Sequence, residues 1–412
     1  MSRNASSQTR NGPKGKATSL RFVETTSITS LISTSGVLPV FVVGALAVLI
    51  RAELNLERTG LGLAISLFWA ASALSAVPLG RLAQRISPAF LIPLSSLGLG
   101  SALLGLALSH TVLEISLWMV LAGVCGAAMQ LAIARLLTES IPVARQGLAF
   151  GIKQAAVPMG TMLAGIGVAI AASTLGWRWT TAIIGLVILT SAPIFRVWAG
   201  RLKTTNHIRK PFRPKNRLAL ALLGLIGACG GFSGTSMATF TVDYLVERQL
   251  TLVNAGLALA LGSVLTVLLR IALGHFVDTT EVRSAGLMAW MMLFGGVGLA
   301  AFAIPGAPAV ISMFVVLGYG LAWSWPGLLL VTTAHWFPTE MAAAAGVVQG
   351  SVWAGATMGP FLTALSVSHA GFPLTWVFLG GVLFTGAFLA LTLSRLPIPV
   401  RDKIQQTSQE KS

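Results

Sequence analysis

Long apolar stretches alternate with short polar connections along almost the whole chain. Each stretch has about 20 residues, enough for a helix to cross the roughly 30 Å hydrocarbon core of a bilayer. The fold class that this pattern predicts is an all-α integral membrane protein. Its twelve predicted transmembrane helices occupy residues 28–50, 60–80, 89–108, 113–137, 147–171, 179–198, 217–242, 255–274, 285–304, 309–335, 343–367 and 372–394.

The composition agrees with a membrane protein. Of the 412 residues, 55% are hydrophobic and only 10% are charged, and the mean hydropathy is +0.81. Water-soluble domains carry about 25% charged residues. The two cysteines, Cys125 and Cys229, stand alone in apolar settings, without disulfide or metal-ligand spacing. We therefore expect no metal and no cofactor.

The net charge of +16 would suggest nucleic-acid binding in a soluble protein. When alternate connections are assigned to alternate sides, with the amino terminus inside, 21 of the 28 Lys and Arg residues fall on the inner side, four outside and three within spans. The positive-inside rule accounts for this bias without nucleic acid. We expect both termini in the cytoplasm and the protein in the cytoplasmic (inner) membrane, with no nucleic-acid partner.

One connection, 199–216, is strongly basic and contains no acid. A topology signal explains it best, and binding of RNA or of lipid headgroups is the alternative. The polar, basic amino terminus predicts disorder. The predicted organisation is a disordered cytoplasmic tail over 1–22, a six-helix bundle over 23–198, a basic cytoplasmic linker over 199–216, a second six-helix bundle over 217–395 and a cytoplasmic tail over 396–412.

The two halves of the chain are related by an internal repeat. Pairs aligned at a shift of 194 or 195 residues are Gly62–Ala64 with Gly256–Ala258, Glu53 with Glu247, 149–154 with 344–349, and Gly176 with Gly371. The halves have six predicted spans each and run in the same direction. This predicts two pseudo-symmetric six-helix bundles, the layout of transporters in which two bundles rock about a central site.

The connection after the second span reads Gly80-Arg81-Leu82-Ala83-Gln84-Arg85, and the related segment reads Gly274-His275-Phe276-Val277-Asp278. With the twelve spans, the basic central connection and the repeat, these segments resemble the major facilitator superfamily over nearly the whole chain. The resemblance implies transport by alternating access, with this connection helping to latch the cytoplasmic side. Gln84 replaces the family's acidic residue in the first copy, and Thr279 replaces the arginine in the second. The gating candidates implied by the resemblance are Gly80, Arg81, Arg85, Gly274 and Asp278.

Three ionisable side chains are predicted well within spans, and all are cations: Arg135, Lys153 and Arg270. Such groups are costly in a bilayer and usually face protein or a water-filled cavity. If Lys153 and Arg270 both face a central cavity, one in each half, an anion would bridge the two bundles. Arg270 also resembles the arginine of anion-carrying branches of the superfamily, such as cyanate and nitrate permeases. The alternatives are structural ion pairs, Lys153 with Glu139 and Arg270 with Asp278.

Several other residues are candidates for gating or binding. Arg135 and Glu139, four residues apart, predict an ion pair on one helix face and are further gating candidates. Tyr319, Trp323 and Trp325 cluster near the middle of the tenth span, where they predict either an apolar wall for the organic part of a substrate or core packing. The remaining candidates for substrate binding are polar side chains within spans: Gln130, Gln154 and Gln349.

Secondary transport of a small anion, organic or inorganic and most simply inward, is the leading functional hypothesis. The expected partners are a small-molecule anion, a coupled proton or a counter-anion, and the lipid bilayer around a monomeric protein. The alternatives are efflux of drugs or metabolites by proton antiport, and a membrane receptor that does not transport. We expect no enzyme, because no grouping of nucleophile, base and orienting residue is present.

Overall fold

The computed structural model describes residues 13–141, 149, 151–202, 216–280, 282–338 and 340–397. Within these ranges, only the backbone is described for residues 13–21 and for Val77, Ala83, Gln84, Thr138, Asp278 and Ala342. All the regular secondary structure of the described part is helical, as predicted. The gaps include most of the basic connection 199–216, which lies largely outside the described residues.

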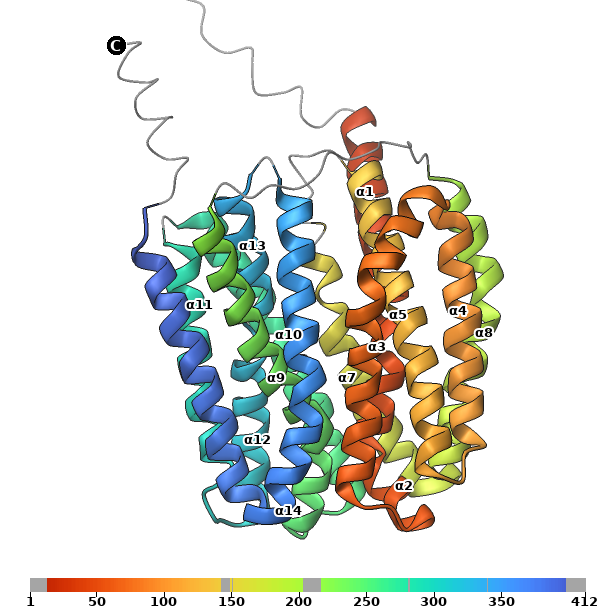
Figure 1. Cartoon of the computed structure of the whole chain (residues 1–412), viewed down its shortest axis with the longest axis vertical. Helices are drawn as coiled ribbons and strands as arrows, with labels where there is room; N and C mark the ends of the chain where they lie inside the picture. The colour runs from red at the N-terminus through yellow and green to blue at the C-terminus, as the bar shows by residue number, and fades with distance from the viewer. Residues whose placement is uncertain are drawn as a thin grey trace, which may run out of the picture.

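The helices form two groups in chain order, drawn at the right and the left of Figure 1. The first group contains α1 (Pro13–Ala45), α2 (Ala47–Leu54), α3 (Arg58–Arg85), α4 (Pro88–Ala107), α5 (Val112–Ser140), α7 (Ala156–Ile170), the π-helical turn η2 (Ala171–Leu175) and α8 (Gly176–Gly200). The second group contains α9 (Arg217–Glu247), α10 (Leu252–Thr279), α11 (Ser284–Ala301), α12 (Pro308–Ala322), α13 (Pro326–Trp336) and α14 (Met341–Arg395).

The described helices are long enough for twelve membrane crossings. Among the described residues, ten helical stretches are long and apolar enough to span a bilayer, and two of them, Gly151–Gly200 and Ala343–Arg395, have 50 and 53 residues. At 1.5 Å per residue, each of these two is long enough for two crossings. The backbone leaves the helical region in the middle of each, at Gly176 (φ 69°) and Gly371 (φ 73°), and Figure 1 shows α14 reversing direction.

Two sides of the molecule can be distinguished in Figure 1. The start of α1 and the end of α14 lie on one side, which we name the terminal side, and α2 and the reversal of α14 lie on the other, which we name the hairpin side. Helix α1 begins at Pro13, inside the tail 1–22 that the sequence predicted to be disordered. Proline at a first helical position favours helix formation because its φ is already fixed.

The bundles contact each other through small residues of α3, α7, α10 and α14. A Cβ atom added to Gly62 of α3 would lie 3.0 Å from the carbonyl oxygen of Pro360, and one added to Gly256 of α10 would lie 2.6 Å from that of Gly165. Such close approach is possible only for glycine. The two contacts are related by the repeat, so the structure confirms the alignment of Gly62 with Gly256.

These contacts lie in the hairpin-side halves of the helices. In the terminal-side halves, no atom lies within 4 Å of a Cβ built on Gly80, Gly274 or Gly346. Large apolar side chains there are also exposed, including Leu74 at 81% and Ile271 at 66%. The bundles are therefore packed most tightly toward the hairpin side.

Candidate functional site

Arg270 lies in α10 at the interface between the bundles, and its guanidinium contacts both of them. Its Nε and Nη2 donate to the backbone carbonyl of Trp323, in the second bundle, at 3.1 and 2.7 Å. Its Nη1 donates to the backbone carbonyl of Gln154, in the first bundle, at 2.6 Å. Arg270 thus joins the bundles through backbone oxygens. Asp278, the alternative partner, has its side chain outside the described residues.

Lys153 lies at a break in the fifth crossing. The helix stops at Lys153, and α7 begins only at Ala156. The Lys153 side chain is partly exposed and has no hydrogen-bond or ion-pair partner in the described part of the chain. Glu139, the alternative partner, accepts instead from Nε of Arg135 at 2.7 Å. Arg270 contacts the backbone of Gln154, so the backbone next to Lys153 lies at the interface that holds Arg270.

An aromatic cluster, formed by Phe41, Trp69, Tyr319 and Trp323, crosses the same interface. Phe41 of α1 meets Trp323 edge-to-face at 5.7 Å between ring centroids, and it meets Trp69 of α3 at 6.3 Å. Tyr319 meets Trp323 at 5.7 Å. Within the described residues, the indole N–H of Trp69 is buried without a hydrogen-bond partner. The sequence indicated the second-bundle rings and missed Phe41 and Trp69.

Other predicted binding residues lie elsewhere. Trp325 is 1% exposed, and its ring fills the space beside Gly230 inside the second bundle. Gln130 donates from Nε2 to the carbonyl of Ser33 at 2.9 Å, within the first bundle. Gln349 in α14 is partly exposed. No contact found among the described residues joins any of these three side chains to the embedded cations.

The predicted gating residues differ in their surroundings. The ion pair between Arg135 and Glu139 is confirmed, and Nη1 of Arg135 also donates to the carbonyl of Ile86 at 3.0 Å. This contact fixes the terminal-side end of α5 against the connection between α3 and α4. Four further predicted gating residues have open surroundings: Arg81 and Arg85 are exposed, and Cβ atoms added to Gly80 and Gly274 would have no atom within 4 Å.

A second group of charges closes the hairpin side, and the sequence did not predict its geometry. This hairpin-side ion cluster consists of Arg51, Arg58, Asp243 and Glu247. Asp243 of α9 accepts from Arg51 at 2.8 Å and from Arg58 at 2.9 Å, and Glu247 accepts from Arg58 at 2.6 Å. The Asp243 side chain is only 7% exposed. Both arginines belong to the first bundle and both acids to the second, so the cluster joins the bundles.

The repeat offered one signal for this cluster, because it aligns Glu53 with Glu247. Glu53 pairs within the first bundle, with Nε of Arg178 at 2.6 Å and with the indole N–H of Trp177 at 2.7 Å. The hydrogen bond from Arg178 is the main cause that lowers the pKa of Glu53 below its ordinary 4.5. The two aligned acids therefore have different partners, one within a bundle and one across the interface.

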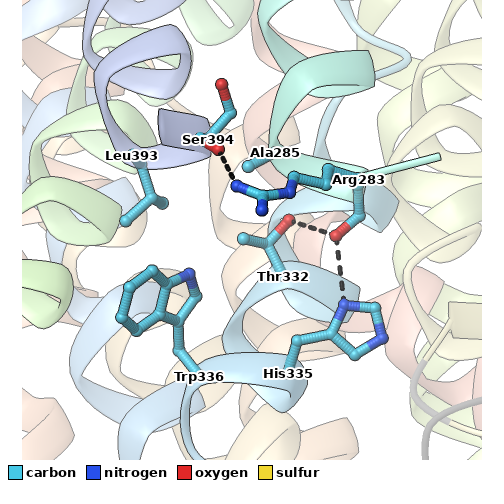
Figure 2. Close-up of a pocket in the computed structure, with 8 residues that line it drawn as sticks. Arg283, Ala285, Thr332, His335, Trp336, Leu393 and Ser394 are labelled. Carbon is cyan, nitrogen blue, oxygen red and sulfur yellow. Dashed lines mark hydrogen bonds between the residues drawn. The ribbon is translucent and has the colours of Figure 1, made fainter. Parts of the chain in front are cut away.

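A small pocket lies within the second bundle, at the terminal-side ends of α11, α13 and α14. Thr332 donates to the Ser284 hydroxyl at 3.0 Å, and that hydroxyl meets Nδ1 of His335 at 3.3 Å. The dashed lines at Thr332 and His335 in Figure 2 mark these bonds. Arg283 donates across the mouth to the carbonyl of Ser394 at 2.6 Å. No group of three or more His, Cys, Asp or Glu suited to a metal ion occurs among the described residues. The pocket is separate from the interface that holds Arg270.

Comparison with known proteins places this architecture in context. The family model described as Major Facilitator Superfamily matches residues 27–333. A solved bacterial homologue of the human lysosomal transporter Spinster, inward-facing and occupied, is similar at a TM-score of 0.71 and 17% identity, covering 90% of this chain and 96% of that chain. Its unoccupied inward-facing form gives a TM-score of 0.70 and 15% identity, with 91% and 97% coverage. These identities establish similarity of fold alone. No curated protein matches in sequence.

Proposed function

The chain belongs to the major facilitator superfamily, and from this premise we propose that this multi-pass membrane transporter carries a small anion by alternating access. The anion binds at the interface between the bundles, with Lys153 and Arg270 as its principal partners. The aromatic cluster contacts the organic part of the anion, where it has one. Gln154, beside Lys153, and its repeat counterpart Gln349 in α14 are proposed as further polar contacts for the anion.

The observation that supports an anion is the absence of an acid at either cation in the described part of the chain. Arg270 contacts only backbone carbonyls, and Lys153 contacts no partner. An embedded cation without a fixed counter-charge favours a substrate that supplies the negative charge. The planar guanidinium also suits a carboxylate or another oxyanion, to which it can donate two hydrogen bonds.

Inward movement is the simplest direction for this proposal. The positive-inside rule places the terminal side in the cytoplasm, and the protein acts as a monomer in the cytoplasmic membrane. Uptake of an anion works against an inside-negative potential at about 2.3 kcal/mol per charge per 100 mV. A co-transported proton or an exchanged anion would offset the electrical work of this movement.

Binding and uptake by the purified protein test the proposal. A panel of small anions (benzoate, lactate, nitrate and cyanate) is screened by thermal shift, because a ligand stabilises the state that it binds. Labelled forms of the anions that stabilise the protein are then followed into proteoliposomes. Lys153→Ala and Arg270→Ala are each expected to weaken binding by about tenfold or more, as expected for loss of a charged hydrogen bond. Arg196→Ala, which removes an exposed arginine of α8, is the matched control.

Two outcomes would contradict the proposal. If an anion binds equally well to both interface variants and to the control, the site is elsewhere. If no anion in the panel binds, but the protein extrudes a lipophilic compound and keeps that activity after Lys153→Ala, efflux replaces anion uptake as the function.

A further inference from the structure

We propose that Pro158 and Arg270 together form a clasp between the bundles, in which the proline exposes the carbonyl that the arginine holds. The clasp rests on the proposed function in one respect, because Arg270 is also a proposed partner of the anion. Pro158 is a positioning residue: it acts on Arg270 through the backbone of Gln154.

The backbone near the start of α7 explains why this carbonyl is available. In an α-helix, the carbonyl of a residue accepts from the N–H four positions later. The residue four positions after Gln154 is Pro158, which has no N–H. The neighbouring bonds run from Gln154 to Gly151, from Ala155 to Ile152 and from Met159 to Ala155. The Gln154 carbonyl is therefore left over, and Nη1 of Arg270 donates to it at 2.6 Å.

The repeat shows that both halves of the clasp are departures from symmetry. At the shift of 195, Pro158 corresponds to Trp353, which has an N–H, and α14 runs without a break through that position. At the shift of 194, Arg270 corresponds to Ala76. The symmetry-related interface lacks both the free carbonyl and the cation. Two independent departures from the repeat thus meet in one hydrogen bond.

The geometry of Arg270 makes this bond a link between the bundles. Two of its nitrogens are fixed to the carbonyl of Trp323, just beyond the end of α12. Only Nη1 reaches the first bundle. Of the five guanidinium N–H groups, these three hydrogen bonds use three, so among the described residues two remain for a substrate oxygen. Loss of the Gln154 contact would release one bundle from Arg270 and leave its charge in place.

Pro158→Ala separates the clasp role of Arg270 from its role in anion binding. Alanine at position 158 supplies a backbone N–H that can donate to the Gln154 carbonyl in place of Arg270. Pro158→Gly supplies the same N–H without a side chain, so an effect shared by both variants does not depend on the packing of the alanine methyl group. Pro193→Ala restores an N–H in α8, at an exposed position, and is the matched control. All variants are made in a Cys125→Ala and Cys229→Ala background. Size-exclusion chromatography and circular dichroism compare their folding with that of the parent.

Spin labels at Leu82→Cys in α3 and Phe276→Cys in α10 report the separation of the bundles on the terminal side. Both positions are exposed, at 40% and 45%. Three variants remove the clasp in the absence of ligand: Pro158→Ala, Pro158→Gly and Arg270→Ala. Each is expected to change the ratio of conformations with short and long label distances by about tenfold, because a hydrogen bond to a charged donor is lost. Pro193→Ala is expected to leave the distances unchanged.

Anion binding by thermal shift distinguishes the clasp from the transport proposal. Pro158→Ala is expected to retain binding of the anion found in the panel, and Arg270→Ala to lose it. If the Pro158 variants leave the distances unchanged while Arg270→Ala abolishes anion binding, the clasp is wrong and the anion site stands. If the Pro158 and Arg270 variants shift the distances but no anion stabilises the parent protein, the clasp stands and the anion site is wrong.

Discussion

Two donor groups near Arg270 have no acceptor in the described part of the chain. The indole N–H of Trp69 is buried and unpaired there, and Lys153 adds a second donor group without a partner. An unsatisfied buried donor costs about 1–3 kcal/mol. A ligand with several acceptor oxygens would remove this cost, so the polar groups at the interface agree with the charges in favouring an oxyanion.

Trp69→Phe tests whether the indole N–H serves a ligand. The aromatic ring remains, and the unpaired donor disappears, so the melting temperature of the ligand-free protein is expected to stay the same or rise slightly. If the bound anion accepts from Nε1, its dissociation constant rises by about tenfold. Thermal shift and titration calorimetry measure both quantities. Trp376→Phe, which removes another buried unpaired indole N–H, is the control and leaves anion binding unchanged. Equal effects of the two variants would remove Trp69 from the site.

Glu53 gives a pH-dependent contribution to stability on the hairpin side. The Arg178 hydrogen bond lowers its pKa below the ordinary 4.5. Its stabilising effect is therefore complete above the ordinary pKa and disappears as the pH falls through the lower, folded value. Glu53→Gln is expected to melt slightly earlier than the parent at pH 7 and at the same temperature as the parent once the pH is well below 4.5. A difference that persists unchanged in acid would contradict this assignment.

At the scale of residues, sequence reasoning found the charges but not all of their partners. Lys153 and Arg270 were recognisable because cations are rare in apolar stretches. The acceptors of Arg270 are backbone carbonyls, which every residue has and which no residue type identifies in advance. For Trp325 the sequence allowed either core packing or a wall of the substrate site. Its ring lies beside Gly230 inside the second bundle, which agrees with core packing. Only a tertiary contact could distinguish the two.

The reversals of the two longest helical stretches are the elements that the repeat predicts best. Gly176 and Gly371, aligned from the sequence, have nearly the same backbone angles, with φ 69° and ψ 169° against φ 73° and ψ 171°. Asn55 and Gln249, also separated by 194 residues, both have positive φ, at 52° and 65°. The repeat therefore extends to the connections on the hairpin side as well as to the helices.

Gly371→Ala is expected to destabilise the protein by about 1–3 kcal/mol, because an alanine does not tolerate this backbone conformation. The cause is the backbone alone, since the nearest atom to an added Cβ is the Pro373 ring at 3.7 Å. Gly176→Ala should have a similar cost. Gly381→Ala, at a helical position of α14 with no atom within 4 Å, is the control and should stabilise slightly through helix propensity. Denaturation of the purified variants measures the differences; equal stability of Gly371→Ala and Gly381→Ala would contradict the assignment.

Breaks within crossings were harder to predict than the crossings themselves. Hydrophobicity marked the fifth and tenth spans as single stretches, because it depends on the length and the apolar character of a segment. The structure separates α12 from α13 just before Pro326, where the proline ring cannot continue the hydrogen bonding of the preceding helix. The break at Gln154 lies four residues before Pro158, so it becomes visible only when the missing N–H is traced back to its acceptor.

At the scale of the whole molecule, contacts at two levels of the interface hold the bundles together. On the hairpin side, glycines allow close backbone contact and the hairpin-side ion cluster joins opposite charges across the interface. Deeper in the interface, Arg270 holds one carbonyl from each bundle. The repeat predicted the two bundles. The ion cluster could not be predicted from the sequence, because its arginines and acids lie about 185–192 residues apart in the chain. The number of charges does not specify which of them form pairs.

Opening of the hairpin side must break the bonds of Asp243, which is the most buried member of the ion cluster. Asp243→Asn keeps the shape of the side chain and removes its charge, which leaves two arginines without their main counter-charge. Removing one partner from a buried ion pair destabilises the paired state by about 3 kcal/mol. We therefore expect the population with an open hairpin side to rise by at least about tenfold.

The labelling rate of Thr239→Cys measures this opening. Thr239 is 4% exposed and packs against Gly44 across the bundle interface, so a membrane-impermeant maleimide reacts only when the hairpin side opens. With Cys125→Ala and Cys229→Ala in the background, Asp243→Asn should accelerate labelling. Glu53→Gln is the matched control, because it removes the repeat-related acid whose ion pair stays within one bundle. If both variants accelerate labelling equally, general loosening explains the effect; if only Asp243→Asn does so, the ion cluster holds the hairpin side closed.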